Sequence, residues 1–524
     1  MADAPLLPGP TLATHGMVAS EHPLVSQTGV DVLRRGGNAF DAAIAMSALL
    51  PVVKPSRSHL GGDAYILAWP KKEARVTAIC SGGRAPAGAT HDAYAGGIPV
   101  HGGKAVAIPG LVDAWAAFHQ RWCTRPLDEL LRPAIAYARD GFPVSRELEL
   151  LLRGARGLFT KYTALAKTLY PGGQPPAFGQ TLKQPALART LEAVAKGGRA
   201  AFYEGKLAQQ IAKDVQKAGG VLTADDLASH RADVSEPLST QYHDYTVYET
   251  PPNSQGLILL EELNILEGCA MRAWGHLSAD AVHHMVEAKK MAFEDRHRLA
   301  GDPAFTGFDP KTLLDKGWAS QRRAEIDPQR TRPSRAATPS HDTTSFVVAD
   351  GDGNVCSFIQ SVFAPFGSAV CIEDLGIIMN NRMCGFSTDV NSPNVIQPGK
   401  RTMHTLNTYL VFKDKAPYLI GNTPGADFQV QTNLQVITAV LDYGLDPQAA
   451  LDAPRWGHTP NGLLIEEEMP DDTRDDLRRR GHDVTPAPRR TNPTGRPQAI
   501  LIDRQTGALI GASDSRGEGL AAGW

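Results

Sequence analysis

The sequence predicts a layered α/β protein in which helices pack on central sheets. Helical patterns dominate the first part of the 524-residue chain, strand-like runs cluster after Thr343, and 42% of the residues are hydrophobic. A chain of this length and apolar content can bury a large core, and helices on sheets are the usual way to do so. Length alone is compatible with two to four domains or with one large enzyme core.

The earliest clear element is a turn followed by a helix in "RRGGNAFDAAIAMSALLPVV", residues 34–53. Gly36 and Gly37 suit the turn, while Asn38 is a suitable N-cap with Asp41 three residues later, which is the spacing of a capping box. The Ala-rich segment that follows is apolar on nearly all sides, so we expect it to be buried.

Further elements follow from turn and stop signals. "HLGGDAYILAW" (59–69) indicates a Gly-Gly turn that leads into a strand, and the helix in 126–145 should stop at Gly141 and Pro143. Residues 277–303 predict a long amphipathic helix. Residues 328–342, rich in Pro, Ser, Thr and Arg, predict an exposed or mobile loop. The expected strands after it are 344–350, 354–363, 376–381, 408–414 and 416–422, with a strand-to-helix element in 425–444.

Composition excludes several classes of protein. The formal net charge is -3 and basic residues form no block, so nucleic acid is not an expected partner. Six sparse cysteines without a C-x-x-C pair indicate reduced thiols, and no apolar run approaches the roughly 18 residues of a membrane span. The first 20 residues carry no secretory pattern. We therefore expect a cytoplasmic protein that binds neither membrane nor nucleic acid.

Thr343 stands where the predicted loop meets the first strand of the strand-rich part. A threonine hydroxyl is a weak nucleophile, but it is activated when the residue is the first of a chain and its own α-amine acts as the base. Such a role requires cleavage between Asp342 and Thr343. From the local pattern alone, an ordinary loop followed by an ordinary strand is the more frequent explanation.

The chain resembles the gamma-glutamyltransferase family of N-terminal-nucleophile (Ntn) hydrolases along nearly its whole length. The matching blocks, in the family's order, include "GMVASEHPLVSQTGVDVLRRGGNAFDAAIAMSALL", "RAPAGAT", "AIPGLVDAW", "TPPNSQGLILLEELNILEG", "EAKKMAFEDRHRLAGDP", "DTTSFVVADGDGNVCSFIQS", "PFGSAV", "PGKR" and "GASDSRGEGLAAGW". The resemblance implies a four-layer αββα sandwich. It also implies a proenzyme that cuts itself before Thr343 into a large subunit, 1–342, and a small subunit, 343–524, which share one core.

The resemblance implies further catalytic roles at matching positions. Ser361 supplies a hydroxyl beside the nucleophile, where familiar members have Thr. The backbone N–H groups of Gly425 and Ala426 form the oxyanion hole, although "TPGA" alone would suit a plain type II turn. No metal and no organic cofactor is expected.

The substrate-binding positions depart from the family pattern. Where glutathione-cleaving members have an Arg, this chain has His91, and a Ser-Ser pair is replaced by His404 and Thr405. The Asn, Gln and Asp that hold a γ-glutamyl ammonium correspond to Phe363, Arg382 and Gly385. Arg382 would repel an ammonium but could hold a carboxylate through two hydrogen bonds. A structural salt bridge for Arg382 and a satisfied core position for His404 are the alternatives.

These departures predict an amidohydrolase rather than a γ-glutamyl enzyme. The blocks "FIQSVFAPFGS", "NNR" and "HTLN" resemble a branch that includes oxamate amidohydrolase-like and YwrD-like members. We expect a small amide substrate whose acyl part carries a carboxylate without a neighbouring ammonium. The alternatives are a true gamma-glutamyltransferase or glutathione hydrolase with a rebuilt pocket, and a non-catalytic ligand-binding relative. Water or an amine could resolve the acyl-enzyme, and a homodimer is left open.

One further cluster resembles a metal site in composition. His283, His284 and Glu287 lie close together in the predicted 277–303 helix. Adjacent histidines point to different faces of a helix, and no H-E-x-x-H motif is present, so the surface of the helix is the expected location of these side chains.

Overall fold

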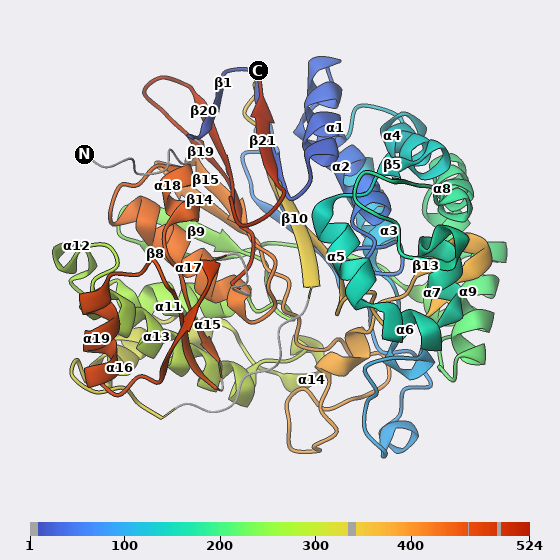
Figure 1. Ribbon diagram of the computed structural model, residues 1–524. Coiled ribbons are helices and arrows are strands. Elements are labelled where there is room, and N and C mark those ends of the chain that lie inside the picture. The colour runs from blue at the N-terminus through green and yellow to red at the C-terminus, as the bar shows by residue number, and fades with distance from the viewer. Residues whose placement is uncertain (1–8, 334–341, 460, 490–493) are drawn as a thin grey trace.

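The computed structural model describes residues 9–333, 342–459, 461–489 and 494–524. Two seven-stranded antiparallel sheets stack face to face, with helices on both outer sides, which makes the four layers of an αββα sandwich (Figure 1). The first sheet contains, in spatial order, β1 (Thr11–Ala13), β20 (Leu509–Ser513), β19 (Gln498–Ile502), β15 (Ala416–Asn422), β14 (Tyr409–Lys413), β9 (Tyr245–Glu249) and β8 (Leu238–Tyr242).

The second sheet carries the predicted nucleophile at the start of one of its central strands. Its order is β21 (Leu520–Gly523), β2 (Gly16–Ser20), β10 (Asp342–Asp350), β11 (Val355–Phe363), β3 (Asp63–Trp69), β4 (Thr77–Ser81) and β7 (Asp233–Ser235). Smaller ladders join β5 (Phe142–Pro143) to β6 (Thr181–Leu182), β12 (Cys371–Ile372) to β13 (Ile377–Ile378), and β16 (Trp456–Thr459) to β17 (Gly462–Glu466) and β18 (Val484–Ala487).

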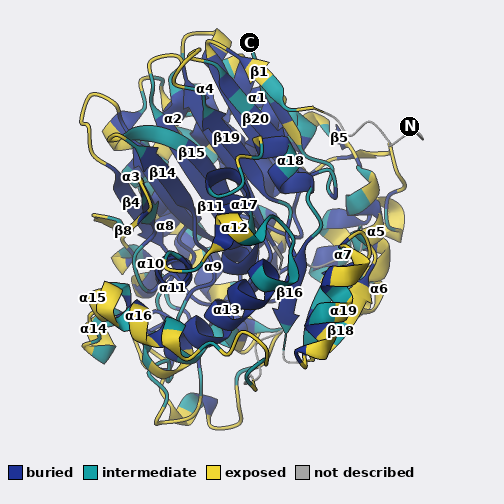
Figure 2. Cartoon of the chain, turned by 90° about the vertical axis from the view of Figure 1, so that its left-hand side faces the viewer, coloured by how far each residue is buried: buried dark blue, intermediate teal, exposed yellow. Residues whose placement is uncertain are grey.

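Each sheet buries one face on helices and the other on its partner sheet. Along β10, Phe346 and Val348 belong to the core under the helices of the second sheet, whereas Val347 and Ala349 belong to the core between the sheets. This alternation is the period-2 pattern of a strand with two buried faces. Figure 2 shows both sheets dark with buried residues and most exposed residues on outer helices and loops.

The helices of the outer layers come from both halves of the sequence. The second sheet is covered by α1 (Pro23–Arg34), α2 (Ala39–Val53), α3 (Leu111–Trp122), α4 (Leu127–Asp140), α8 (Pro185–Tyr203) and α9 (Gly205–Lys217). The first sheet is covered by α11 (Gly256–Leu266), α13 (Ala279–Leu299), α16 (Lys316–Ala324), α17 (Phe428–Leu441) and α18 (Pro447–Asp452). No helix within the described ranges is long and apolar enough to span a membrane.

Local signals predicted several elements correctly. Asn38 caps α2 by accepting hydrogen bonds from the N–H groups of Phe40 and Asp41, the capping box is complete, and every residue of the helix is buried. Helix α4 ends at Gly141, whose φ of 100° lies where residues with a Cβ are strained. The loop predicted over 328–342 falls mainly on residues 334–341, which lie outside the described residues.

The amphipathic character predicted for the 277–303 helix is wrong. Helix α13 is buried along most of its length, because it packs against α11 and α19 (Asp471–Arg479). Charged residues such as Glu287 and Lys290 are therefore inside the protein, where they pair with one another at 2.9 Å. Tertiary packing covers a face that the sequence pattern assigned to solvent.

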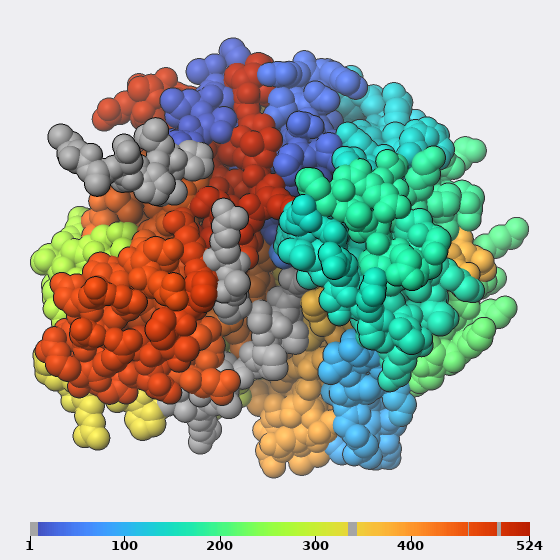
Figure 3. Space-filling view, viewed as in Figure 1, coloured from blue at the N-terminus to red at the C-terminus, as the bar shows by residue number. Residues whose placement is uncertain are grey.

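Residues on the two sides of the predicted cleavage position contribute to both sheets. Strands β10 and β11 pair with β2 and β3, and β14 pairs with β9. At the C-terminal end, β20 and β21 pair with β1 and β2. The red C-terminal strands accordingly lie beside the blue N-terminal segments in Figure 3.

Candidate active site

Thr343 lies at the start of β10, and its side chain contacts that of Ser361 on the neighbouring strand β11. The Thr343 hydroxyl donates a hydrogen bond to Ser361 Oγ over 3.2 Å, and both residues are buried. A hydroxyl that donates a hydrogen bond gains electron density on its oxygen, which favours attack on a carbonyl. Ser361 Oγ also accepts a hydrogen bond of 2.8 Å from the N–H of Phe363.

Buried charges hold the backbone on the other side of Thr343. Arg57 Nη1 approaches the Thr343 carbonyl oxygen at 3.4 Å and pairs with Glu21 at 2.9 Å. Glu21 in turn accepts a hydrogen bond from the Ser345 N–H at 2.9 Å. Arg57 also contacts Glu147, so a network of acidic and basic side chains fixes the first residues of β10. Sequence reasoning did not select Arg57 and Glu21, although Glu21 lies in the matching block that starts at Gly16, because their contacts with β10 exist only in the folded chain.

Arg382 is connected to Ser361 by a closed ring of four contacts, which run through Asp63 on one side and Phe363 on the other. Ser361 pairs with Asp63 across β11 and β3, and Asp63 Oδ2 accepts a hydrogen bond of 2.8 Å from Arg382 Nε. The Arg382 guanidinium lies 4.3 Å from the centre of the Phe363 ring, and Phe363 returns to Ser361 through its backbone N–H. A cation over an aromatic face at this distance is held favourably.

The two outer nitrogens of Arg382 are buried and lack hydrogen-bond partners among the residues that the structure describes. Arg382 is 1% exposed, and neither Nη1 nor Nη2 has a hydrogen-bond partner among the described residues. Buried donors without partners are rare, and each one raises the free energy of the folded protein. The alternative that predicts a structural salt bridge accounts for Nε and Asp63 only; it leaves the bidentate edge of the guanidinium unused.

His404 contacts Asp63 and not the unpaired Nη1 and Nη2 atoms of Arg382. Its Nε2 lies 3.1 Å from Asp63 Oδ2, and its Nδ1 accepts a hydrogen bond of 3.2 Å from the Leu406 N–H. Burial, together with the Arg382 charge, lowers the pKa of His404 to about 4, so the ring is neutral at pH 7 and Nε2 carries the proton. Both nitrogens are thus occupied, which favours the core-histidine alternative over direct substrate contact.

Asp63 is the shared partner of these groups, and sequence reasoning did not select it. Burial opposes its ionisation, yet Arg382 and His404 together hold the pKa of Asp63 below its usual value. Its position directly after Gly61 and Gly62 offered a signal. A Cβ on Gly62 would come within 2.3 Å of the Ser361 carbonyl oxygen, so only glycine lets this turn approach β11.

The remaining predicted substrate residues lie in segments around this cluster. His91 is exposed, and its Nε2 lies 3.0 Å from the Thr388 carbonyl oxygen, six residues after Arg382. Thr405 is buried, and its carbonyl accepts a hydrogen bond of 2.8 Å from Gln255. The segments around His91 and Arg382 pack together through an apolar cluster that includes Ala89, Tyr94, Met383 and Phe386.

Gly425 and Ala426 form the turn between β15 and α17. Their φ angles are 126° and 50°, so both backbones lie in the left-handed region. Among the described residues, neither N–H group donates a hydrogen bond within the protein, which leaves two backbone donors free for an oxyanion. Asn422, at the end of β15, donates to the Phe346 carbonyl at 2.9 Å and so attaches this strand end to β10.

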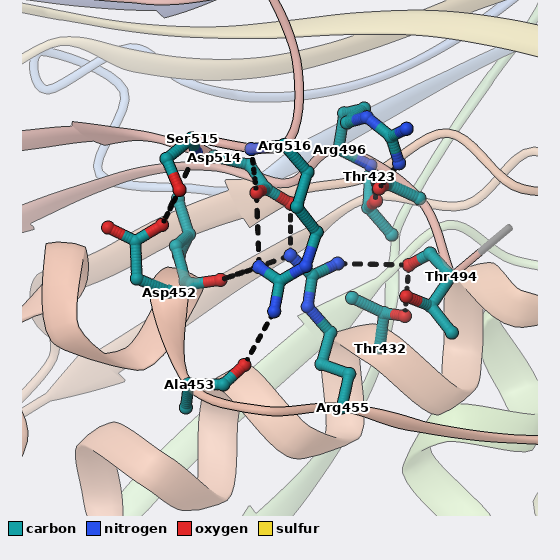
Figure 4. Close-up of polar contacts among 12 residues, drawn as sticks. Thr423, Thr432, Asp452, Ala453, Arg455, Thr494, Arg496, Asp514, Ser515 and Arg516 are labelled. Carbon is teal, nitrogen blue, oxygen red and sulfur yellow. Dashed lines mark hydrogen bonds and ion pairs between the residues drawn. The ribbon is translucent and has the colours of Figure 1, made fainter. Parts of the chain in front are cut away.

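A second segment supports the same turn from the C-terminal side. The Arg496 N–H donates a hydrogen bond of 3.1 Å to Thr423 Oγ1, and the Thr494 carbonyl accepts hydrogen bonds from Thr432 and Arg455. Figure 4 shows these residues beside the cluster of Arg455, Arg516 and Asp514, in which two buried arginines share one aspartate. The turn at 424–427 is therefore fixed from two directions.

The cluster on α13 is buried, so its predicted location on the helix surface is wrong. Ligand atoms of His283, Glu287 and His482 lie within 4.8 Å of one another. Lys290 Nζ, however, lies 2.9 Å from Glu287 Oε1, and His283 Nδ1 lies 2.8 Å from His482 Nε2. An ammonium already neutralises the carboxylate, and the two imidazoles satisfy each other, which disfavours a divalent cation at this cluster.

Comparison with known proteins identifies the family to which the chain belongs. The family model described as gamma-glutamyltranspeptidase matches residues 25–524. The glutathione hydrolase-like YwrD proenzyme of Bacillus subtilis is 40% identical over 98% of this chain and 99% of its own length. The oxamate amidohydrolase proenzyme of Klebsiella pneumoniae is 33% identical, with the same coverage.

A solved structure covers the whole fold. The crystal structure of cephalosporin acylase from Bacillus halodurans is 36% identical, with a TM-score of 0.94 over 100% of this chain and 99% of that one. Together with the family match and the two relatives, this likeness covers both sheets and the residues around Thr343. The chain belongs to the gamma-glutamyltranspeptidase family and is an Ntn-type amide hydrolase.

Proposed function

We propose that this protein is a self-processing amidohydrolase that removes the amine from small amides whose acyl part carries a carboxylate and no neighbouring ammonium. The observation that carries this proposal is the open edge of Arg382, with Nη1 and Nη2 buried and unpaired in a ring of contacts that includes Ser361. A carboxylate is the group that a guanidinium edge binds through two parallel hydrogen bonds.

Maturation begins with Thr343 acting on its own chain. The Thr343 Oγ attacks the carbonyl carbon of Asp342, the peptide C–N bond breaks, and an ester forms in its place. Water then hydrolyses that ester, which leaves a carboxylate at Asp342 and a free α-amine on Thr343. In the uncleaved chain the backbone of Asp342 pairs with that of Phe363. Cleavage would therefore also release the backbone of Phe363, whose ring lies against Arg382.

Turnover then uses the new amine as the base. The Thr343 hydroxyl gives its proton to the amine, and its oxygen attacks the amide carbon while the N–H groups of Gly425 and Ala426 hold the oxyanion. The amide C–N bond breaks, the leaving amine takes the proton, and an acyl-Thr343 ester remains. Water attacks this ester, the acid leaves, and the Thr343 hydroxyl is restored. Each oxyanion donor contributes about 3 kcal/mol to such a step.

Gel electrophoresis tests the maturation step. Cleavage before Thr343 divides the 524 residues into 342 and 182, so a protein of 56.2 kDa should give bands of about 37 and about 20 kDa. Thr343→Ala should leave one full-length band, because the nucleophile is absent. Cleavage of Thr343→Ala at the same peptide bond would contradict the assignment of Thr343, and an uncleaved, inactive wild-type protein would favour the non-catalytic alternative.

Three matched anilides test the substrate class. The glutaryl 4-nitroanilide carries a carboxylate, the valeryl compound has a methyl group in its place, and the γ-glutamyl compound adds an ammonium beside the carboxylate. We expect the cleaved protein to prefer glutaryl over both others in kcat/KM, with oxamate as a shorter anionic amide. Preferential turnover of the γ-glutamyl anilide would contradict the proposal and favour a gamma-glutamyltransferase or glutathione hydrolase with a rebuilt pocket. The name of a relative, the glutathione hydrolase proenzyme of Escherichia coli, supports that alternative.

A further inference from the structure

Gln255 connects the turn proposed to hold the oxyanion with the segment of His404 and Thr405, which supports Asp63 and, through Asp63, Arg382. This residue lies just before α11 and is 1% exposed. Its Nε2 donates one hydrogen bond of 2.9 Å to the Ala426 carbonyl and another of 2.8 Å to the Thr405 carbonyl. One side-chain amide therefore uses both of its protons to join the turn at 424–427 to the segment of His404 and Thr405.

The backbone of Gln255 strengthens the same connection. Its N–H donates a hydrogen bond of 2.8 Å to the His404 carbonyl, while the His404 N–H donates one of 2.7 Å to the Asn253 carbonyl. The segment that contains His404 is thus bonded like a strand along residues 253–255. His404 contacts Asp63, and Asp63 contacts Arg382. The position of Gln255 therefore affects the position of the Arg382 guanidinium through these two further contacts.

Arg296 fixes the orientation of the Gln255 amide from α13. Arg296 Nη1 donates a hydrogen bond of 2.7 Å to Gln255 Oε1, so the amide oxygen faces Arg296 and the NH₂ group faces the two carbonyls. The same guanidinium pairs with Asp427 at 2.7 Å and 3.2 Å. Asp427 directly follows Ala426, so Arg296 supports the turn both directly and through Gln255.

The turn needs such support because of its backbone. Ala426 has a φ of 50°, a region that residues with a Cβ occupy rarely and at a cost in energy. A strained backbone keeps its geometry only where surrounding contacts hold it. The contacts to the Ala426 carbonyl come from Gln255 Nε2 at 2.9 Å and from the Gln429 N–H at 3.1 Å.

We infer that Gln255 is a positioning residue that sets the distance between the oxyanion turn at 424–427 and the segment of His404 and Thr405, which holds Asp63 and thereby Arg382. The inference rests on the proposed function for the roles of the two segments. It assigns Gln255 no contact with substrate. A shift of about 1 Å between reacting groups can cost about 100-fold in rate, so loss of this connection should reduce the chemical step.

Gln255→Met is the direct test, because methionine keeps the length of the side chain and removes all three of its hydrogen bonds. In the cleaved protein, we expect kcat to fall about 100-fold on both the glutaryl and valeryl anilides. KM should rise several-fold on the glutaryl anilide alone, since only that substrate uses Arg382. Arg296→Lys, which keeps the charge but loses the paired contacts, should give a smaller change in the same direction.

Gln435→Met provides a matched control. Gln435 also makes three side-chain hydrogen bonds, to the carbonyls of Gln431 and Trp456 and from the Trp456 N–H, but it touches neither segment of the site. This variant should lose thermal stability without the change in kcat. The inference is overturned if Gln255→Met keeps kcat within twofold of wild type, or if both variants lose kcat equally.

The two proposals fail in different ways. A wild-type protein that turns over the valeryl anilide as well as the glutaryl one contradicts the proposed substrate class, while the kcat comparison between Gln255→Met and Gln435→Met still decides the inference. If Gln255→Met does not fold, Arg296→Lys decides it by the same comparison of kcat, because that variant keeps a buried cation beside Asp427.

Discussion

At the scale of single residues, the site is defined by the arrangement of one buried carboxylate and one buried guanidinium. Asp63 has a depressed pKa because Arg382 and His404 outweigh the effect of its burial, so it is ionised and fully engaged. An engaged carboxylate offers nothing to an ammonium, while the open edge of Arg382 offers two donors to a carboxylate. The proposed selectivity for anionic acyl groups rests on this pairing.

Arg382→Gln should therefore lower kcat/KM for the glutaryl anilide by about 10-fold to 100-fold, since a hydrogen bond to a charged group contributes about 1.5–3 kcal/mol. The valeryl anilide should change little. Steady-state kinetics on the two substrates measures the difference. The substitution also takes the Arg382 cation away from Asp63, which keeps its contact with His404, so relative activity on the γ-glutamyl anilide should rise.

Arg322→Gln separates this effect from a general loss of stability. Arg322 is also buried and paired with an aspartate, Asp295, but it lies on α16 in the outer layer. Both variants should unfold at lower temperature than wild type, because each removes the arginine that pairs with a buried carboxylate. Equal losses on both anilides in Arg382→Gln would remove Arg382 from substrate binding.

Residue roles differ in how well the sequence predicts them. Thr343 and Ser361 stand on neighbouring strands next to short motifs, and the structure places their oxygens 3.2 Å apart. Asp63 and Gln255 lie far from their partners in the sequence, and their importance depends on contacts that exist only after folding. Sequence patterns report local chemistry, so such long-range contacts escape them.

At the scale of elements, the residues that begin and end helices, such as N-caps and stop glycines, gave the most reliable predictions. The capping box of α2 depends on residues within one turn of each other, so its sequence alone determines it. The burial of α13 depends on α11 and α19, which no pattern inside α13 can indicate. The sequence therefore predicted where helices begin and end better than which of their faces are covered.

Asn38→Ala tests the energetic weight of the α2 cap. The substitution leaves the N–H groups of Phe40 and Asp41 without their acceptor and should lower the free energy of unfolding by about 1 kcal/mol. Chemical denaturation of the Thr343→Ala precursor measures it in a single chain. Asn38→Ser keeps a capping oxygen and should lose less; an equal loss in both variants would attribute the effect to the Asn38 contact with the Trp122 carbonyl instead.

At the scale of the whole molecule, the proposed cleavage would cut a chain whose two parts cannot be separated without breaking both sheets. In the described part of the chain, five strand pairs join residues before 342 to residues after it. They include the central pairs of β10 with β2 and of β11 with β3. The core between the sheets likewise combines residues such as Leu67 and Trp69 with Val347 and Leu410. Cleavage would release one peptide bond and none of these contacts.

The two products of cleavage should therefore remain one particle. We expect the cleaved protein to elute from a size-exclusion column as a single species that contains both bands on a denaturing gel, even after dilution to nanomolar concentration. Separation would expose the strand edges and apolar faces of both sheets to water. The free energy lost on exposing so much apolar surface strongly opposes separation. The Thr343→Ala precursor is the control for the elution volume. Elution of the 182-residue product as a separate folded species would show that residues 343–524 form a core of their own, and would contradict the intertwined arrangement of strands on which the proposed maturation depends.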